Sequence, residues 1–248
     1  MRRVIRFFIY NCHCFAELPA MNSTLEDAFE RMYQRYGAQD WWPGDSPLEI
    51  IVGAVLTQNT NWKNVELAID NLRQANVLSI VELLCIETNK LEELIRPAGY
   101  FRLKTKRLRN VLQFIVSEFG SIDSMFRSEL HTLRNQLLEV NGVGPETADA
   151  ILLYAGDLPT FVIDTYTRRV ASRHGWIEMD ADYDALKALF ETHLRDYRGA
   201  TGNYRSATEL FNEYHALLVN VGKDYCKPTP QCDDCPLCAM LPKNGPLI

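Results

Sequence analysis

Apolar residues along the chain recur at the spacing of a helix rather than that of a strand. Leu25, Phe29, Met32 and Tyr36 lie three or four positions apart, which places them on one face of a helix. Segment 50–56 is apolar on nearly all sides, which is typical of a helix at the centre of a core. No run alternates apolar and polar positions as a half-buried strand does. The pattern therefore predicts an all-α fold.

Capping signals indicate where several of these helices begin. In Ser46-Pro47-Leu48-Glu49 a serine N-cap precedes a proline at the first helical position and a capping glutamate. The pairs Ser23 with Glu26 and Ser79 with Glu82 form similar capping boxes. We expect further helices over 104–119 and 127–140, a first helix that ends near Gly37, and a late helix from Leu210 that Gly222 stops.

Length and composition are those of an ordinary globular protein. The chain has 248 residues, of which 47% are hydrophobic and 23% charged, enough for one large domain or two modest ones. No apolar run is long enough to cross a bilayer, so no membrane association is expected. The first twenty residues resemble a signal peptide poorly, because Arg6 splits the apolar stretch. We expect 1–20 to be a loose extension, or an upstream start with Met21 as the alternative.

A formal net charge of −6 excludes a protein that coats nucleic acid through bulk charge, yet it allows a local basic face. Five basic residues fall within eight positions of segment 102–109. Leu103 and Leu108 would leave these charges on the outer face of a helix. We therefore expect Lys104 and Lys106 to contact phosphates, the alternative being an ordinary solvated helix face.

Two glycines separate a pair of helical segments in Val140-Asn141-Gly142-Val143-Gly144-Pro145-Glu146-Thr147-Ala148. They allow a tight turn that exposes backbone N–H groups at the start of the next helix, where a phosphate oxygen can bind. By itself, Gly-x-Gly more often marks an ordinary turn between helices. The wider pattern, from Leu138 to Leu152, is typical of a helix-hairpin-helix that binds DNA without sequence specificity.

Four of the seven cysteines, Cys226, Cys232, Cys235 and Cys238, lie within thirteen residues. Disulfide scaffolds spread their cysteines along the chain, whereas a tight group is typical of a metal site in a cytosolic protein. Four thiolates can hold a [4Fe-4S] cluster or one Zn²⁺ ion. The spacing alone leaves both open.

The segment Phe161-Val162-Ile163-Asp164-Thr165 begins seventeen residues after Gly144, and Arg169-Val170 follows it. With the hairpin before it and the four-cysteine loop after it, the chain resembles the endonuclease III superfamily of DNA glycosylases over roughly residues 25–240. The resemblance implies a two-domain helical fold with DNA bound across the cleft. It also implies that Asp164 is the catalytic carboxylate. Without that context, a helix N-cap, aided by Thr165, is the favoured explanation of Asp164.

The proposed role for Asp164 is chemically sensible. Cleavage of an N-glycosidic bond builds positive charge on the sugar, which a nearby anion stabilises while it orients the attacking water. The implied architecture is a helical barrel domain over 40–155 and a second domain of 21–39 plus 156–248. Relatives that carry a cluster space their cysteines by six, two and five residues, so the first and last gaps here are shorter. The position after the terminal helix favours the cluster, with a role in structure and DNA docking.

Glu146 is the informative departure from the family pattern. Bifunctional members carry at this hairpin position a lysine that forms a Schiff base with the sugar and nicks the strand. No lysine occurs between Lys106 and Lys187, so a covalent amine mechanism lacks its nucleophile. We therefore expect a monofunctional enzyme that uses water. Glu146 is also compatible with a first-turn acid that complements the helix dipole.

The run from Gly144 to Ala148 and the segment 57–60 also resemble the endonuclease III-like subfamily that excises 3-methyladenine, which implies alkylated purines as substrates. In the family, a side chain at the position of Gln58 fills the gap left by a flipped base. Gln58 and Asn59 are equally well explained as caps around a turn. Three tryptophans are candidates for the base pocket, or else anchors of core and loop: Trp41, Trp42 and Trp62.

The sequence thus predicts a cytosolic base-excision enzyme, monomeric by default, that acts on duplex DNA with a damaged base. One alternative is a bifunctional glycosylase and lyase acting on oxidised pyrimidines, and another is a non-catalytic helix-hairpin-helix module that only binds DNA. The expected DNA-binding residues are Gln58, Asn59, Lys104, Lys106, Gly142, Val143, Gly144, Glu146 and Thr147.

Overall fold

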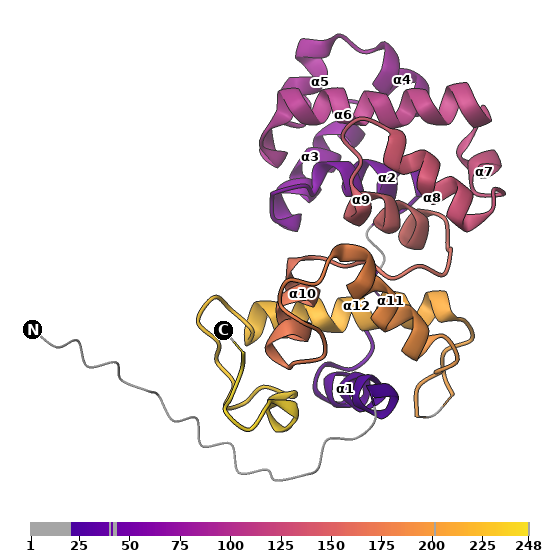
Figure 1. The fold of residues 1–248 in the computed structure, drawn as a ribbon. Helices are drawn as coiled ribbons and strands as arrows, with labels where there is room; N and C mark the ends of the chain where they lie inside the picture. The colour runs from indigo at the N-terminus through magenta and orange to yellow at the C-terminus, as the bar shows by residue number, and fades with distance from the viewer. Residues whose placement is uncertain (1–20, 40, 42–43, 201, 248) are drawn as a thin grey trace, which may run out of the picture. The chain divides into compact units, whose positions relative to one another are not determined.

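The computed structural model of the chain describes residues 21–39, 41, 44–200 and 202–247. These residues form helices joined by turns and loops and contain no strand, which confirms the all-α prediction. The chain divides into two compact units (Figure 1). Of the described residues, those within 41–162 form the first, here called the hairpin unit, and those within 21–39 and 163–247 form the second, the split unit. The predicted extension over 1–20 lies outside the described residues.

The hairpin unit is built around α2 (Pro47–Leu56), whose residues from Glu49 onward are all buried. Ser46 caps this helix as predicted, because its hydroxyl accepts a hydrogen bond from the backbone N–H of Glu49 at 3.3 Å. The other helices surround it: α3 (Trp62–Gln74), α4 (Ile80–Cys85), α5 (Thr88–Leu94), η1 (Arg96–Ala98), α6 (Phe101–Phe114), η2 (Ile115–Phe119), α7 (Ile122–Met125), α8 (Leu130–Glu139), α9 (Pro145–Ala150) and η3 (Ile151–Ala155).

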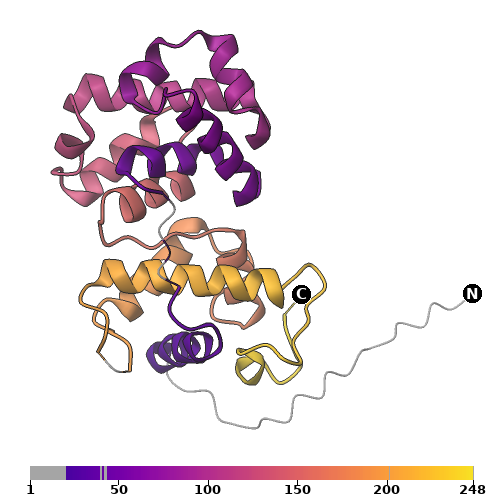
Figure 2. The same ribbon diagram turned by 180° about the vertical axis from the view of Figure 1, so that it is seen from behind.

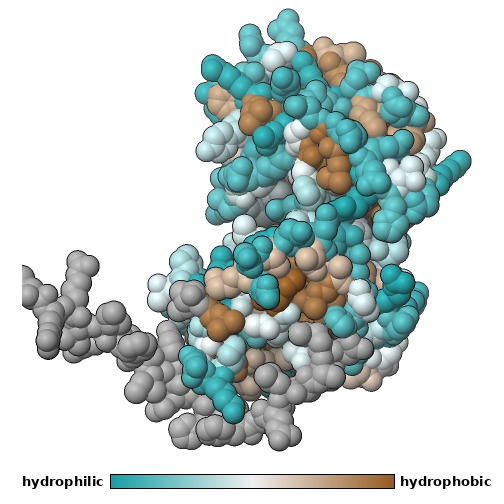
Figure 3. All heavy atoms as spheres, in the orientation of Figure 1, coloured by the Kyte–Doolittle hydropathy of each residue, from teal (hydrophilic) through white to brown (hydrophobic). Residues whose placement is uncertain are grey.

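The surface of the hairpin unit is mainly hydrophilic on the face seen in Figure 3, with apolar residues in small separate groups. The large apolar side chains that it exposes are dispersed over α3, α4, η2 and the start of α6: Leu67, Val81, Tyr100, Leu103 and Val116. The core therefore takes up the apolar faces that the helical spacing predicts. Among the residues with assigned positions, no helix is long and apolar enough to span a membrane.

The split unit contains α1 (Met21–Tyr36), α10 (Thr165–Arg173), α11 (Tyr183–Leu194), α12 (Ala207–Asp224) and η4 (Cys238–Met240). Helix α12 runs through the middle of this unit in both views (Figures 1 and 2). Helices α10 and α1 pack against it, and α11 packs against α1. Phe29 of α1 packs against the rings of Tyr197, Tyr204 and Tyr214 at centroid distances of 5.4–6.0 Å. Segments far apart in sequence thus share one core.

Helix boundaries differ from the predicted ones at several points. Gly222 does not stop α12, which continues to Asp224. A Cβ atom at this glycine would lie 2.4 Å from Cδ1 of Tyr166, so the glycine serves the close contact between α10 and α12. Helix α8 begins at Leu130 instead of 127, because Glu129 caps it by accepting from the N–H of Thr132 at 2.8 Å. Helix α1 begins at Met21, before Ser23, and α6 begins at Phe101, before 104.

Candidate DNA-binding, catalytic and metal sites

The predicted hairpin joins α8 to α9. The N–H of Val143 donates to the carbonyl of Val140 at 2.9 Å and closes the turn, while the Val143 side chain is buried. Gly142 has a φ of +99°, which favours glycine. Gly144 is exposed and is the N-cap of α9, with Pro145 at the first helical position. The turn thus presents an exposed backbone at the start of a helix, which suits contact with an anion.

Gln58, in the turn between α2 and α3, holds this hairpin by its side chain. Its amide nitrogen donates to the carbonyl of Gly142 at 3.0 Å and to the hydroxyl of Thr147 at 2.9 Å. Its amide oxygen accepts from the Arg107 guanidinium at 2.5 Å. Gln58 therefore lies against the hairpin. Its neighbour Asn59 is exposed and has a φ of +54°.

The contact with Arg107 makes Gly142 sensitive to substitution. A Cβ atom there would lie 2.3 Å from Cγ of Arg107, and φ is unfavourable for alanine. We expect Gly142→Ala to lower the free energy of unfolding by about 1–3 kcal/mol and to weaken duplex binding. Gly144→Ala is the matched control, since its φ of −99° is ordinary and no atom lies within 4 Å; its stability should change by less than about 0.5 kcal/mol. Equal losses in urea unfolding would contradict this explanation.

A buried ion pair fixes the two helices of the motif relative to each other. Arg134 of α8 contacts both carboxylate oxygens of Asp149 of α9, at 2.8 and 3.1 Å. The hydroxyl of Thr160 donates to the same carboxylate at 2.9 Å. Asp149 is completely buried. Sequence reasoning missed this residue, although an acid inside an otherwise small and apolar run was a visible signal.

The expectation that Lys104 lies on the outer face of its helix is wrong. Lys104 is 1% exposed, and its ammonium donates to the carbonyls of Leu56 at 2.8 Å and Ala98 at 2.7 Å. These residues end α2 and η1, where helical carbonyls lack intrahelical partners. Burial, together with the nearby Arg107 charge, lowers the pKa of Lys104 to about 8. Lys104 therefore joins helix ends, whereas Lys106 is exposed.

The three tryptophans predicted to line the base pocket differ in what the structure shows of them. Trp41 is half-buried, and its ring centroid lies 5.7 Å from that of Tyr154. Trp62 begins α3 and packs against α2, where a Cβ atom at Gly53 would lie 3.2 Å from the indole. Trp42 lies outside the described residues. Trp41 thus packs on the buried ring of Tyr154.

Asp164 is the N-cap of α10. Its Oδ1 atom accepts from the backbone N–H of Thr167 at 2.7 Å, and Oδ2 lies 3.7 Å from Nε2 of His215 on α12. His215 is buried; burial lowers the pKa of its imidazole, and the Asp164 charge opposes this effect. One carboxylate oxygen is thus engaged in capping while the other faces a buried imidazole. A lone histidine in the apolar pattern of α12 was the signal that sequence reasoning did not use.

Glu146 is exposed in the first turn of α9. Lys106 and Lys187 flank the long stretch of sequence without lysine. They lie on α6 and α11, outside the hairpin. Lys187 is 7% exposed, and its ammonium lies 2.7 Å from a carboxylate oxygen of Glu191. Thr147, beside Glu146, is buried against Gln58. The hairpin therefore presents a carboxylate at its exposed helix start.

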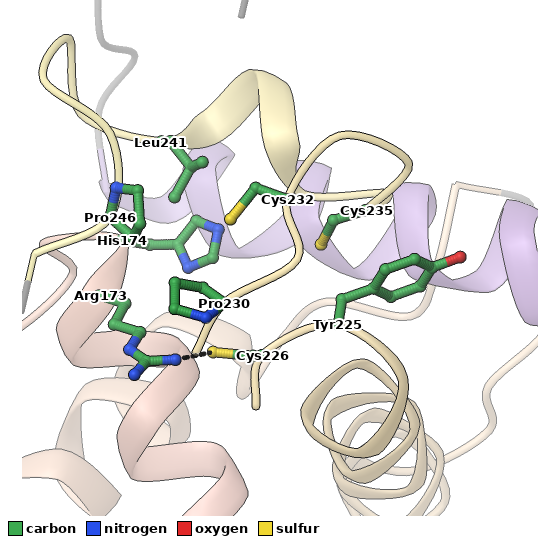
Figure 4. A pocket seen from close by; sticks show the side chains of 9 residues that line it. All are labelled: Arg173, His174, Tyr225, Cys226, Pro230, Cys232, Cys235, Leu241 and Pro246. Atoms are coloured by element: carbon green, nitrogen blue, oxygen red, sulfur yellow. Dashed lines mark hydrogen bonds between the residues drawn. The ribbon is translucent and has the colours of Figure 1, made fainter. Parts of the chain in front are cut away.

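The four predicted metal ligands follow α12, but only three of them line the same pocket. Cys226, Cys232 and Cys235 line one pocket with His174 (Figure 4). Cys238 begins η4 and does not line this pocket. Among the described residues, no three histidine, cysteine or acidic side chains lie close enough to hold an ion as they stand. The thiol donors suit a soft metal centre, but the geometry does not fit a preformed four-thiolate site.

Two arginines of α10 tie the cysteine loop to the helix that Asp164 begins. The Arg173 guanidinium donates to the carbonyls of Lys227 at 2.5 Å and Pro228 at 2.9 Å, and lies 3.5 Å from the sulfur of Cys226. Arg169 donates to the carbonyls of Cys226 and Gly222. The loop is therefore anchored by main-chain contacts that do not depend on a bound group.

Comparison with known proteins decides the family. The model of the family described as HhH-GPD superfamily base excision DNA repair protein matches residues 52–196, more than half of the chain. The chain belongs to this superfamily. This member is 46% identical over 221 residues to a protein of Methanocaldococcus jannaschii that is named as a DNA repair glycosylase, across 86% of this chain and 96% of the relative. The present chain is a base excision repair DNA glycosylase of the endonuclease III-like type.

Solved structures agree on the fold. The Helicobacter pylori 3-methyladenine DNA glycosylase bound to 1,N6-ethenoadenine has a TM-score of 0.72 and 30% identity, and the match covers 82% of this chain and 97% of that chain. A non-covalent complex of endonuclease III with DNA also has a TM-score of 0.72, at 18% identity, over 90% and 96% of the two chains. At 18% identity, the similarity to endonuclease III shows the fold alone.

Proposed function

We propose that this glycosylase is monofunctional: it hydrolyses the bond between base and sugar with water and leaves the DNA backbone uncut. The observation that carries the proposal is the exposed Glu146 at the hairpin position where bifunctional relatives have lysine. An amine is required for the Schiff base that precedes strand cleavage. Lys104, which was also expected to be exposed, is buried against two carbonyls. Neither residue supplies an accessible amine.

In this proposal Asp164 is the catalytic carboxylate. Its Oδ1 atom is held by the N–H of Thr167, so the side chain has a fixed direction while Oδ2 keeps its charge available. Loss of the base leaves an oxocarbenium-like sugar, which a fixed anion stabilises more strongly than the uncharged sugar of the ground state. The same oxygen can accept a proton from the water that attacks the sugar. The base leaves with the electron pair of the broken bond, the water oxygen bonds to the sugar carbon, and the proton of the water passes to Asp164, so no covalent enzyme intermediate forms.

We propose alkylated purines as the substrate class. The similarity to a glycosylase whose structure contains an alkylated adenine supports this choice. The half-buried indole of Trp41 also supports it, because an electron-poor, positively charged base stacks favourably on an indole face. Duplex DNA with such a base is the proposed partner, bound by the hairpin backbone, Asn59, Glu146 and the base-gap residue Gln58. We further propose that the protein acts as a monomer in the cytosol.

The cysteine loop is proposed to bind a thiolate-ligated metal group, either an iron–sulfur cluster or Zn²⁺. Such a group would fix the conformation of the loop, because it would join the cysteine side chains to one another. Its role would be structural, since α10 separates the loop from Asp164 within the split unit. The hydrolytic steps above involve the side chains of the chain alone.

Duplexes that each carry one defined lesion test the proposed function directly. The enzyme should release free alkylated purine, and borohydride should trap no covalent protein–DNA complex. Oxidised pyrimidines and mispaired bases serve as comparison substrates in the same assay. Release of only an oxidised pyrimidine would refute the substrate class, while a borohydride-trapped complex would refute the monofunctional mechanism.

Lys106 is expected to contribute one phosphate contact. Replacing it with methionine should weaken duplex binding for every sequence and reduce the slope of log affinity against log salt by about 1. Lys104→Met is the matched control from the same helix; it should lower stability because the carbonyls of Leu56 and Ala98 lose their donor, with the salt slope unchanged. Fluorescence anisotropy at several salt concentrations measures both. An unchanged slope for Lys106→Met would remove this residue from the DNA interface.

A further inference from the structure

Three polar side chains form a stripe along the face of α6 that contacts the hairpin. Lys104, Arg107 and Asn110 are spaced three positions apart, which places them on the same face of a helix. Asn110 donates from its amide nitrogen to the carbonyl of Asn141 at 2.8 Å. The stem of Arg107 lies against Gly142, because a Cβ atom at this glycine would overlap Cγ of the arginine. Arg107 therefore brings a charged side chain directly to the hairpin turn.

The charge of Arg107 is not balanced by a carboxylate. Its guanidinium donates to the neutral amide oxygen of Gln58 at 2.5 Å, and in the part of the chain that the structure describes it forms no ion pair. Arg134 of α8, by contrast, is paired with Asp149 at 2.8 Å. Arg107 is half-buried, and a partly buried cation gains stability from an opposite charge. An anion from outside the chain would supply that charge.

A second cation nearby increases the effect of such an anion. The Arg107 charge is one cause, after burial, of the lowered pKa of Lys104, so the two positive groups lie close enough to repel each other. Both belong to a chain whose formal net charge is −6, so this local excess of positive charge is not a general property of the protein. An anion bound at Arg107 would relieve the repulsion.

The guanidinium has the donors that such an anion requires. It carries five N–H donors in a planar fork, and among the described residues only Gln58 accepts from them, through Nη1. Two parallel N–H groups of this fork match two oxygens of a phosphate. We propose that Arg107 binds a phosphate of duplex DNA beside the hairpin, so that the hairpin meets the DNA backbone with an arginine charge as well as with main-chain N–H groups. This inference rests on the proposed contact between the hairpin and DNA.

The salt dependence of duplex binding tests this role. The full chain is titrated by fluorescence anisotropy, at several salt concentrations, with a duplex that carries a stable abasic-site analogue and so has no base to release. Arg107→Met should weaken binding and reduce the slope of log affinity against log salt by about 1, whereas Arg107→Lys keeps the charge and should keep the slope. Arg109→Met is the matched control from the same helix. Its guanidinium donates to the hydroxyl of Thr88 at 2.8 Å and to the carbonyl of Ile86, so its loss should leave the slope unchanged.

A second variant covers the case in which Arg107→Met fails to fold, as judged by circular dichroism. Arg107→Gln keeps an amide donor but carries no charge, and it should show the same reduced slope. An unchanged slope in a folded uncharged variant would overturn the proposal, and so would an equal reduction in Arg109→Met, which would assign the effect to net charge. If the unaltered chain binds no duplex, this inference and the proposed partner both fail. Absence of base release, with the slopes as predicted, would refute the proposed activity alone.

Discussion

Asp164→Asn is expected to abolish base release while leaving DNA affinity nearly unchanged. The substitution keeps size and shape, and its amide oxygen can still accept the 2.7 Å bond from the N–H of Thr167, so α10 keeps its N-cap. What is lost is the negative charge that faces the developing cation and takes the proton of water. We expect the single-turnover rate to fall by about 10²–10⁴-fold, measured with saturating enzyme on a duplex that carries one alkylated purine.

Asp182→Asn is the matched control. Asp182 caps α11 in the same way, because its carboxylate accepts from the N–H of Ala185 at 2.7 Å. Both variants remove one N-cap charge from the split unit, so they share any general effect on stability or net charge. Wild-type rates in Asp164→Asn would mean that Asp164 is an N-cap only, and would favour the alternative of a module that binds DNA without cleaving it.

Asp149→Ala is expected to produce the largest loss of stability, about 3–5 kcal/mol, because it removes the carboxylate that faces the buried Arg134 charge. The side chain of Arg134 is only 12% exposed and that of Asp149 is 0% exposed. The hydroxyl of Thr160 loses its acceptor at the same time. Since the pair connects α8 to α9, duplex affinity should fall together with the free energy of unfolding. Urea unfolding followed by circular dichroism measures the free energy of unfolding.

Lys90→Met provides the contrast. Lys90 and Glu93 also form an ion pair, at 3.1 Å, but their side chains are 54% and 64% exposed. Exposed pairs contribute about 0–1 kcal/mol, so this variant should unfold close to the wild type. If Asp149→Ala costs no more than Lys90→Met, the ion pair does not fix the hairpin helices.

Sequence reasoning found the parts of the fold that depend on local pattern. The capping box at Ser46, the hairpin glycines and the cysteine group each lie within a short segment whose chemistry is readable from neighbouring positions. The helical spacing of Leu25 and Phe29 likewise predicts the buried face of α1. At these positions the local preference of the sequence agrees with the final structure.

What the sequence did not reveal depends on contacts between distant segments. A basic run predicts an exposed face, yet Lys104 turns inward because the carbonyls of Leu56 and Ala98, from two other elements, need a donor. His215 comes near Asp164 only because α12 packs against α10. The same packing explains why Gly222 lies inside a helix. Pairings of this kind are set by tertiary structure, and no spacing rule in one segment predicts them.

His174 illustrates the same limit for the pocket beside the cysteine loop. The spacing of the cysteines directs attention to four thiols, while the imidazole that shares their pocket lies fifty-two positions before Cys226. Only the contact between the end of α10 and the loop brings them together, through Arg173 and its bonds to Lys227 and Pro228.

The central claim, hydrolysis of an alkylated base by water alone, is tested most directly by one assay on methylated duplex DNA. Free base is quantified, and strand breaks are scored before and after treatment with hot alkali. We predict release of methylpurine with breaks only after alkali, since an abasic site remains intact until then. Strand breaks before alkali in a pure preparation would contradict the account, because they require an amine nucleophile that the hairpin does not provide.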